Sequence, residues 1–127
     1  MINKFLRLLL SAAGATALAA GLLTGASGTA HADGRGPDWY GVWAADVNVR
    51  TGGEQCYLWP SVSTCPIVVE TVSAPRAVYV HCQTEGSQTV GGNPYWVWIH
   101  TTNGHYGYMA SYYIQNRTNW IDGVPQC

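Results

Sequence analysis

Four cysteines most constrain what this chain can fold into. They are Cys56, Cys65, Cys82 and Cys127, all in the C-terminal part of a 127-residue sequence. An even number of cysteines in a short chain that reaches an oxidising compartment is typical of disulfides, and four cysteines allow three pairings. We favour Cys56–Cys65, which closes a loop of eight intervening residues, with Cys82–Cys127, which joins the last residue to a central strand. No C-x-x-C motif is present, which disfavours a structural zinc site.

The first 32 residues have the three parts of a secretory signal. Lys4 and Arg7 precede an apolar run from Leu8 to Leu23, and small residues follow up to Ala30-His31-Ala32. The alternative, a membrane anchor, is disfavoured because glycine and threonine interrupt the run and no basic cluster follows it. We therefore predict cleavage after Ala32, which leaves a mature chain of 95 residues without a membrane span.

The mature chain has room for one domain. We expect a flexible leader at residues 33–40 and a single β-domain at residues 41–127, whose C-terminal tail is tied back by a disulfide. With four arginines, no lysine and seven acidic residues, its formal charge is −3. Such a surface is a poor partner for nucleic acid or an anionic membrane. We expect a secreted or wall-associated monomer.

Short segments rich in β-branched and aromatic residues alternate with turns, which is typical of an all-β domain. Strands are predicted at residues 42–49, 67–72, 76–83, 95–100 and 106–109. An Asn103-Gly104 hairpin turn is expected between the last two strands. The remaining expectations are a polar loop at 84–92, a helical turn at 111–114 and an irregular tail at 116–127. The prediction is a small, partly open barrel of about five to seven strands with two disulfides.

Two stretches resemble motifs of a known family. They are Val47-Asn48-Val49-Arg50-Thr51-Gly52 and Gly107-Tyr108-Met109-Ala110-Ser111-Tyr112-Tyr113-Ile114, with Trp96-Val97-Trp98-Ile99 between them. The chain resembles bacterial SH3-like (SH3b) domains, in particular the small exported versions of filamentous actinobacteria. The resemblance covers residues 42–115 and implies an SH3-like barrel that binds a cell-wall peptide. Tyr108 stands where the family often has tryptophan, and the cysteine-containing first loop departs from the family pattern, so the identity of the ligand is not transferred.

No residue pattern indicates a catalytic site. His81 and His100 are expected on strands and His105 beside the hairpin turn, without the three or four converging ligands of a metal site. Paired cysteines lack the thiolate that a nucleophile needs. No serine lies in a G-x-S-x-G elbow, and so small a domain leaves little room for the paired carboxylates of a sugar hydrolase. We expect no enzymatic activity, no cofactor and no metal.

The aromatic residues are the candidate recognition chemistry. Six tryptophans and eight tyrosines exceed what a small core can bury, so some should be exposed and suit contact with peptide or carbohydrate. By resemblance, a ligand groove would lie between the first loop and the closing segment, formed by Asn48, Arg50, Thr51, Tyr57, Trp59, Tyr108, Tyr112 and Tyr113. Arg50 could pair with a carboxylate of a wall stem peptide, or alternatively with Asp46 or Glu54.

Two functions of different kinds fit these observations. The leading hypothesis is a secreted, non-catalytic module that binds a peptidoglycan peptide or another extracellular ligand. The alternative is a small disulfide-stapled inhibitor or protein-interaction domain, because the Cys56–Cys65 loop would present Leu58-Trp59-Pro60 in a pre-organised form. A wall hydrolase is least favoured, since hydrolases with SH3b domains normally carry catalysis on a separate domain.

Overall fold

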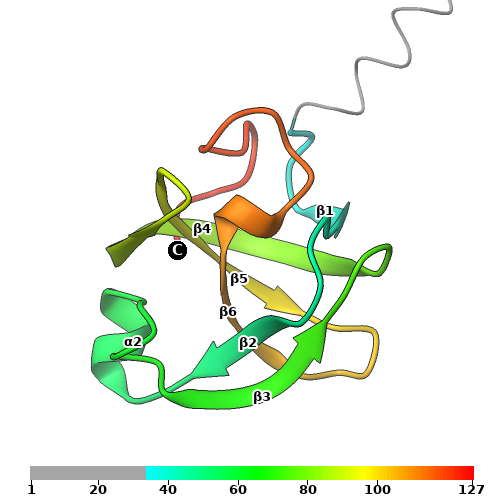
Figure 1. Ribbon diagram of the computed structural model, residues 1–127. Coiled ribbons are helices and arrows are strands. Elements are labelled where there is room, and N and C mark those ends of the chain that lie inside the picture. The colour runs from blue at the N-terminus through cyan, green and yellow to red at the C-terminus, as the bar shows by residue number, and fades with distance from the viewer. Residues whose placement is uncertain (1–33) are drawn as a thin grey trace, which may run out of the picture. The chain divides into compact units, whose positions relative to one another are not determined.

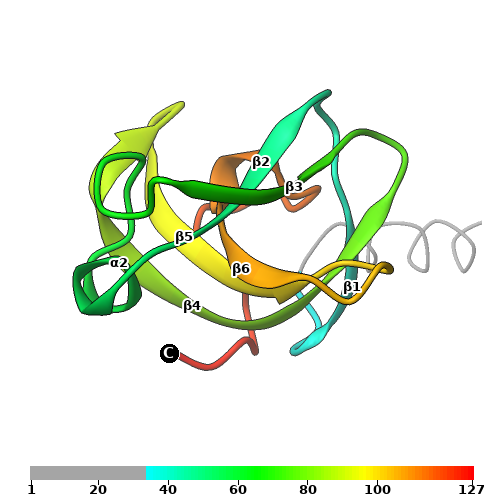
Figure 2. The same cartoon turned by 90° about the horizontal axis from the view of Figure 1, so that it is seen from below.

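The computed structural model describes residues 34–127, and the predicted secretory signal lies outside the described residues. The described chain forms one antiparallel sheet of six strands that curls into a half-barrel (Figures 1 and 2). The predicted fold class, a small, partly open β-barrel, is therefore confirmed. Both favoured cysteine pairs, Cys56–Cys65 and Cys82–Cys127, are present as disulfides, which are typical of proteins in oxidising compartments.

The strands follow one another in the sheet in the order β1-β4-β5-β6-β2-β3. Their bounds are β1 Asp38–Gly41, β2 Val47–Thr51, β3 Ile67–Val72, β4 Ala77–Val90, β5 Asn93–His100 and β6 Tyr106–Ala110. Two short helical elements interrupt them: α2 (Glu54–Leu58), which leads into the first disulfide loop, and the 3-10 turn η1 (Ser111–Tyr113) after β6. In the described residues no helix has the length and apolar character needed to cross a membrane.

Two groups of buried side chains hold the curled sheet together. The main core lies inside the curl, where alternate residues of β4 and β5 such as Val78, Val80 and Ile99 are fully buried. A second cluster surrounds the Cys56–Cys65 disulfide and includes Trp96 and Tyr108. This disulfide thus supplements the apolar core that a domain of this size can build.

The predicted flexible leader is wrong for its last residues. Asp38–Gly41 form strand β1, which pairs with β4, and the Tyr40 side chain is only 1 % exposed. The Tyr40 hydroxyl donates a hydrogen bond to the Gly36 carbonyl at 2.7 Å and accepts one from the Arg35 N–H at 2.9 Å. The strand predicted at 42–49 begins only at Val47, because the preceding residues connect β1 to β2.

The predicted polar loop at 84–92 is also wrong. Strand β4 continues to Val90 and pairs with β5, and the turn consists of Gly91 and Gly92 with φ angles of +58° and +80°. These angles favour glycine. Much of the extension is exposed, so its polar sequence reflects solvent contact and not a lack of strand structure.

The irregular C-terminal tail is held by a buried glutamine on β4. The Gln83 side chain is fully buried, and its amide nitrogen donates to the carbonyls of Ile121 and Val124 at 2.7 and 2.9 Å. The Gln83 amide oxygen accepts from the Ile121 N–H at 2.9 Å. Together with the Cys82–Cys127 disulfide, these bonds place Ile121 and Val124 in the main core.

Candidate binding groove

A groove of about 230 Å³ opens between β2 and the outer end of the β4–β5 hairpin. Asn48 and Arg50 line it from β2, and Gln88 lines it from β4. Trp96 of β5 lies in the lining, and Tyr113 of η1 completes it. Apolar, aromatic and polar groups therefore meet in one concave surface, which is the usual character of a ligand site.

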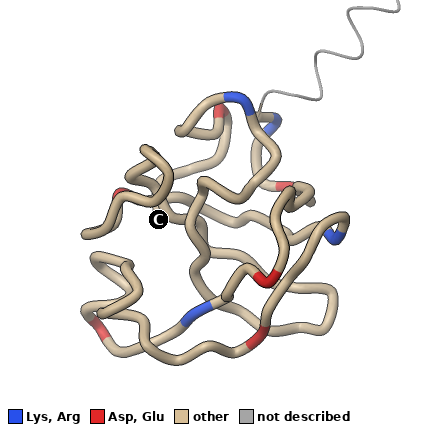
Figure 3. Tube along the Cα trace, viewed as in Figure 1, with Lys and Arg blue, Asp and Glu red and all other residues tan. Residues whose placement is uncertain are grey.

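The groove carries one charge of each sign in a domain that has few charges. Figure 3 shows that charged residues are sparse and scattered over the described chain. Arg50 and Asp46 both line the groove, and the Arg50 guanidinium also donates to the Cys65 carbonyl at 3.3 Å. Asp46 has a φ of +53°, and the Ser73 hydroxyl accepts a hydrogen bond from its N–H at 2.7 Å. Asp46 is thus held through its backbone and Arg50 through its side chain, each by a hydrogen bond to another segment.

The first disulfide loop forms part of the groove through a contact with β4. The Gln88 amide oxygen accepts a hydrogen bond from the Val62 N–H at 2.8 Å, and both residues line the groove. The Trp96 indole N–H donates to the Gln88 carbonyl at 2.9 Å. Val62 and Gln88 are not predicted as site residues by the sequence, because they lie in segments that are far apart along the chain and no local signal shows that the two segments meet.

The eight predicted site residues fall into several places. Asn48, Arg50 and Tyr113 line the groove, whereas Thr51, at the end of β2, does not. Tyr112 lines a neighbouring hollow of about 310 Å³, together with Trp43 and Asn119. The structure therefore brings together three of the residues that were predicted to share one groove.

Tyr108 cannot contact a ligand, because its side chain is fully buried. Its hydroxyl donates to the Tyr57 carbonyl at 3.0 Å. Burial, with a smaller effect of the nearby Tyr57, raises the pKa of Tyr108 to about 12. Tyr108 is therefore a structural residue that joins β6 to α2.

Tyr57 and Trp59 are exposed outside the groove lining. Of the ten large hydrophobic residues that are exposed in the described chain, six lie between positions 57 and 68. We call them the 57–68 patch: Tyr57, Leu58, Trp59, Val62, Ile67 and Val68. The backbone beneath the patch is fixed, since the Trp59 carbonyl accepts from the hydroxyls of Thr64 and Ser87 at 2.9 and 3.2 Å. The segment that carries most of these side chains is thus held in place, and one of them, Val62, also lines the groove.

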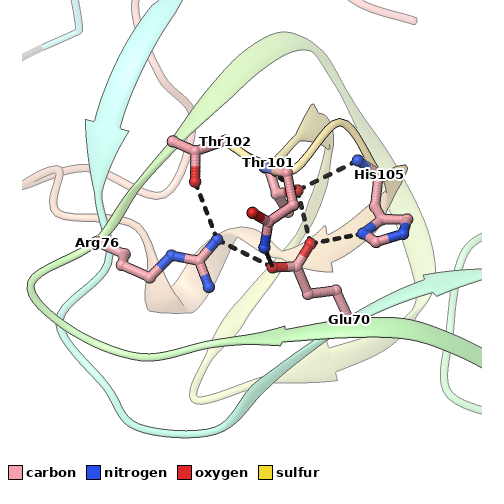
Figure 4. Close-up of polar contacts among 6 residues, drawn as sticks. Glu70, Arg76, Thr101, Thr102 and His105 are labelled. Carbon is pink, nitrogen blue, oxygen red and sulfur yellow. Dashed lines mark hydrogen bonds and ion pairs between the residues drawn. The ribbon is translucent and has the colours of Figure 1, made fainter.

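A polar cluster lies outside the groove lining and is centred on Glu70 of β3 (Figure 4). One Glu70 oxygen accepts from the Thr101 hydroxyl at 2.6 Å and contacts the His105 Nδ1 at 2.8 Å. The other oxygen accepts from Arg76 at 2.9 Å and from the Asn103 amide at 2.7 Å. The cluster therefore fastens the β5–β6 turn to β3.

Glu70 is unsuited to acid–base catalysis. Burial opposes its ionisation, but the hydrogen bonds from Thr101, His105, Arg76 and Asn103 outweigh burial and lower its pKa from 4.5 to about 2. At neutral pH this carboxylate holds no proton to donate, and its oxygens are occupied by four donors. Glu70 therefore has a structural role and holds the β5–β6 turn against β3.

The comparisons with known proteins give no family. No family model, curated protein or solved structure matches the chain. The resemblance to SH3b domains consequently stays a prediction based on the Val47–Gly52 and Gly107–Ile114 motifs.

Proposed function

We propose that this protein is an exported, non-catalytic binding module that takes a short extracellular peptide into the groove. The ligand class is a peptide with both a carboxylate and an amine, such as the stem peptide of peptidoglycan. The observation that carries the proposal is that Arg50, Asp46 and the partly exposed ring of Tyr113 line one concave surface.

The chemistry of the groove favours such a ligand over other classes. A guanidinium forms a strong, charge-assisted hydrogen bond to a carboxylate, and Asp46 can accept from an amine. Tyr113, which is partly exposed, offers ring surface to the apolar parts of a peptide. With one cation in the lining, the groove lacks the clustered positive charge that phosphate backbones require.

The 57–68 patch supports a second candidate function, a protein-interaction domain or inhibitor. Trp and Tyr are the residues that most often dominate the binding energy of protein interfaces. Trp59 and Tyr57 are more than half exposed on a loop that the Cys56–Cys65 disulfide closes. A loop that is already ordered loses little entropy on binding.

Sedimentation with purified peptidoglycan, together with titration of a soluble stem peptide, separates the two candidates. Protein produced from the full-length chain is compared with Arg50→Gln in the groove and Trp59→Ser in the patch. The control is Arg35→Gln, the same charge change at an exposed arginine paired with Asp38, outside the groove lining. We expect Arg50→Gln to weaken binding by about 10- to 100-fold, the range of a lost charged hydrogen bond, and the other two variants to bind like the wild type.

Each other outcome has a definite meaning. Equal binding by the wild type and Arg50→Gln would contradict the groove as the ligand site. Loss of binding in Trp59→Ser alone would move recognition to the patch. No retention of the wild type on peptidoglycan, and no binding of the soluble peptide, would reject the wall-peptide proposal and leave the protein-interaction candidate in front.

A further inference from the structure

Two histidines meet on the outer face of the sheet, away from the groove. His81 lies on β4 and His100 on β5, and the His81 Nε2 is 2.8 Å from the His100 Nδ1. Both side chains are partly exposed. Neither residue belongs to the groove, the 57–68 patch or the Glu70 cluster, so the functions discussed above leave this pair unexplained.

A β-bulge places His81 in this position. Val80 pairs with Ile99 and Cys82 pairs with Trp98, so His81 is the extra residue of β4 opposite β5. Bulges commonly redirect a side chain at functional sites. The irregularity therefore falls on the residue whose imidazole reaches the neighbouring strand.

Aromatic rings frame the two imidazoles on the sheet surface. Tyr79 stacks on His100 with ring centroids 5.2 Å apart, and Tyr106 stacks on His81 at 5.7 Å. Trp39 adds an edge contact to His100 at 5.2 Å. These neighbours come from β1, β4 and β6 and keep both imidazoles on one part of the sheet surface.

The two nitrogens are close enough to share one ion. Their 2.8 Å separation is that of a hydrogen bond between the rings, and ligands of one ion that each lie about 2.0 Å from the metal are about 2.8 Å apart in a square plane and about 3.3 Å apart in a tetrahedron. An ion therefore sits beside the line between the nitrogens, and both imidazoles turn their lone pairs from each other towards it. Within residues 34–127 no group of three His, Cys, Asp or Glu residues could hold a metal ion. Water would therefore complete the coordination shell, as is usual for exposed Cu²⁺ sites with imidazole ligands.

We propose that His81 and His100 form an open two-histidine site for a divalent transition metal, with Cu²⁺ bound most tightly. Imidazole nitrogens suit this class of ion, and Cu²⁺ stands highest in the affinity order of the divalent first-row metals. Binding of the ion breaks the hydrogen bond in which one imidazole donates to the other. That proton moves to the other nitrogen of its own ring through solvent, so both imidazoles bind in their neutral form.

Titration with Cu²⁺ alone, in a buffer that does not chelate it, tests this site. Protein produced from the full-length chain is compared with His81→Gln, His100→Gln and the matched control His105→Gln, which alters an exposed histidine of the Glu70 cluster. We expect one equivalent of Cu²⁺ to bind the wild type and the control. Each of the two site variants should bind at least about tenfold more weakly, since even outer-sphere changes cost that much at metal sites.

Trp39 supplies an independent signal. Bound Cu²⁺ quenches nearby indoles, so binding should reduce tryptophan fluorescence, and Trp39→Phe should lose most of that reduction without losing Cu²⁺. Circular dichroism shows whether each variant is folded. Absence of stoichiometric Cu²⁺ binding by the wild type, or binding that is unchanged in folded His81→Gln and His100→Gln, would overturn the proposal and leave the pair as a hydrogen bond.

Discussion

The Glu70 carboxylate connects two segments that are far apart in the sequence. Its partners Thr101, Asn103 and His105 lie in the β5–β6 turn, more than 30 residues away, and Arg76 precedes β4. Each hydrogen bond to a charged group stabilises by about 1.5 to 3 kcal/mol where water is excluded, and by less where it is not. Arg76 and His105 are partly exposed, so water screens part of this stabilisation.

The Glu70 cluster should make folding stability depend on acid pH. The pKa of Glu70 is lowered from 4.5 to about 2 in the folded protein, so folding favours the ionised form. Its contribution, about 2 kcal/mol after allowance for screening, is complete above pH 4.5 and is lost as the pH falls towards 2. Urea unfolding at several pH values should show Glu70→Gln less stable than the wild type at pH 6, with the difference shrinking towards pH 2. A difference that is constant over this range would contradict the assignment.

Side-chain partners of this kind could not be predicted from the sequence. Nothing near Glu70 or Gln83 indicates partners 31 to 41 residues away. Tyr108 was predicted as a groove residue but is buried, and this error has another cause. Alternation identifies a buried face only when the other face of the strand is exposed. In β6 both faces are covered, one by the main core and one by the disulfide cluster. Asn48, Arg50 and Tyr113 lie together in the groove lining because the groove is at the junction of the two motifs that contain them; their role in binding stays a prediction.

Strand β1 shows what decides whether a polar segment joins the fold. Most residues around it are polar or glycine, which predicts a mobile leader, yet a single buried tyrosine orders the strand against β4. The long β4–β5 hairpin follows the same logic, since its turn needs only two glycines and its outer half is exposed. The strands predicted at 76–83, 95–100 and 106–109 were predictable because β-branched and aromatic residues are concentrated in them.

Substitutions on the two faces of β1 should have very different effects. Tyr40→Ala removes a buried ring and should cost about 3 to 5 kcal/mol of unfolding free energy. Trp39→Ala, on the outer face of the same strand, loses only ring contacts and should cost about 1 kcal/mol. Thermal or urea unfolding measures both. If residues 33–40 were a mobile leader, neither substitution would change stability.

At the scale of the whole molecule, the two disulfides act over different lengths of chain. Cys56–Cys65 spans 9 residues and Cys82–Cys127 spans 45. A longer loop removes more conformational freedom from the unfolded chain, so the chain-entropy relation gives about 2.6 kcal/mol for the first and about 4 kcal/mol for the second.

Removing each pair separately tests this ranking. Cys82→Ala with Cys127→Ala should lower the stability more than Cys56→Ala with Cys65→Ala, because it also frees the tail from Gln83. Urea unfolding of the two double variants compares them directly. The reverse order would mean that the cluster packed around Cys56 and Cys65 contributes more than the restriction of the chain.

The Cys82–Cys127 disulfide also turns the C-terminal third of the chain into a covalent ring. Residues 82–127, which include β5, β6 and η1, are closed on themselves, and the earlier strands extend from the ring as a single tail. A protease that cuts once inside the ring, for example after the exposed Arg117, opens it without releasing a fragment. The cut protein stays one covalent molecule until the disulfide is reduced, whereas a cut in the tail outside the Cys56–Cys65 loop divides the chain into two covalently separate pieces. Damage by secreted proteases would therefore be visible on a reducing gel long before any part of β5 or β6 left the molecule.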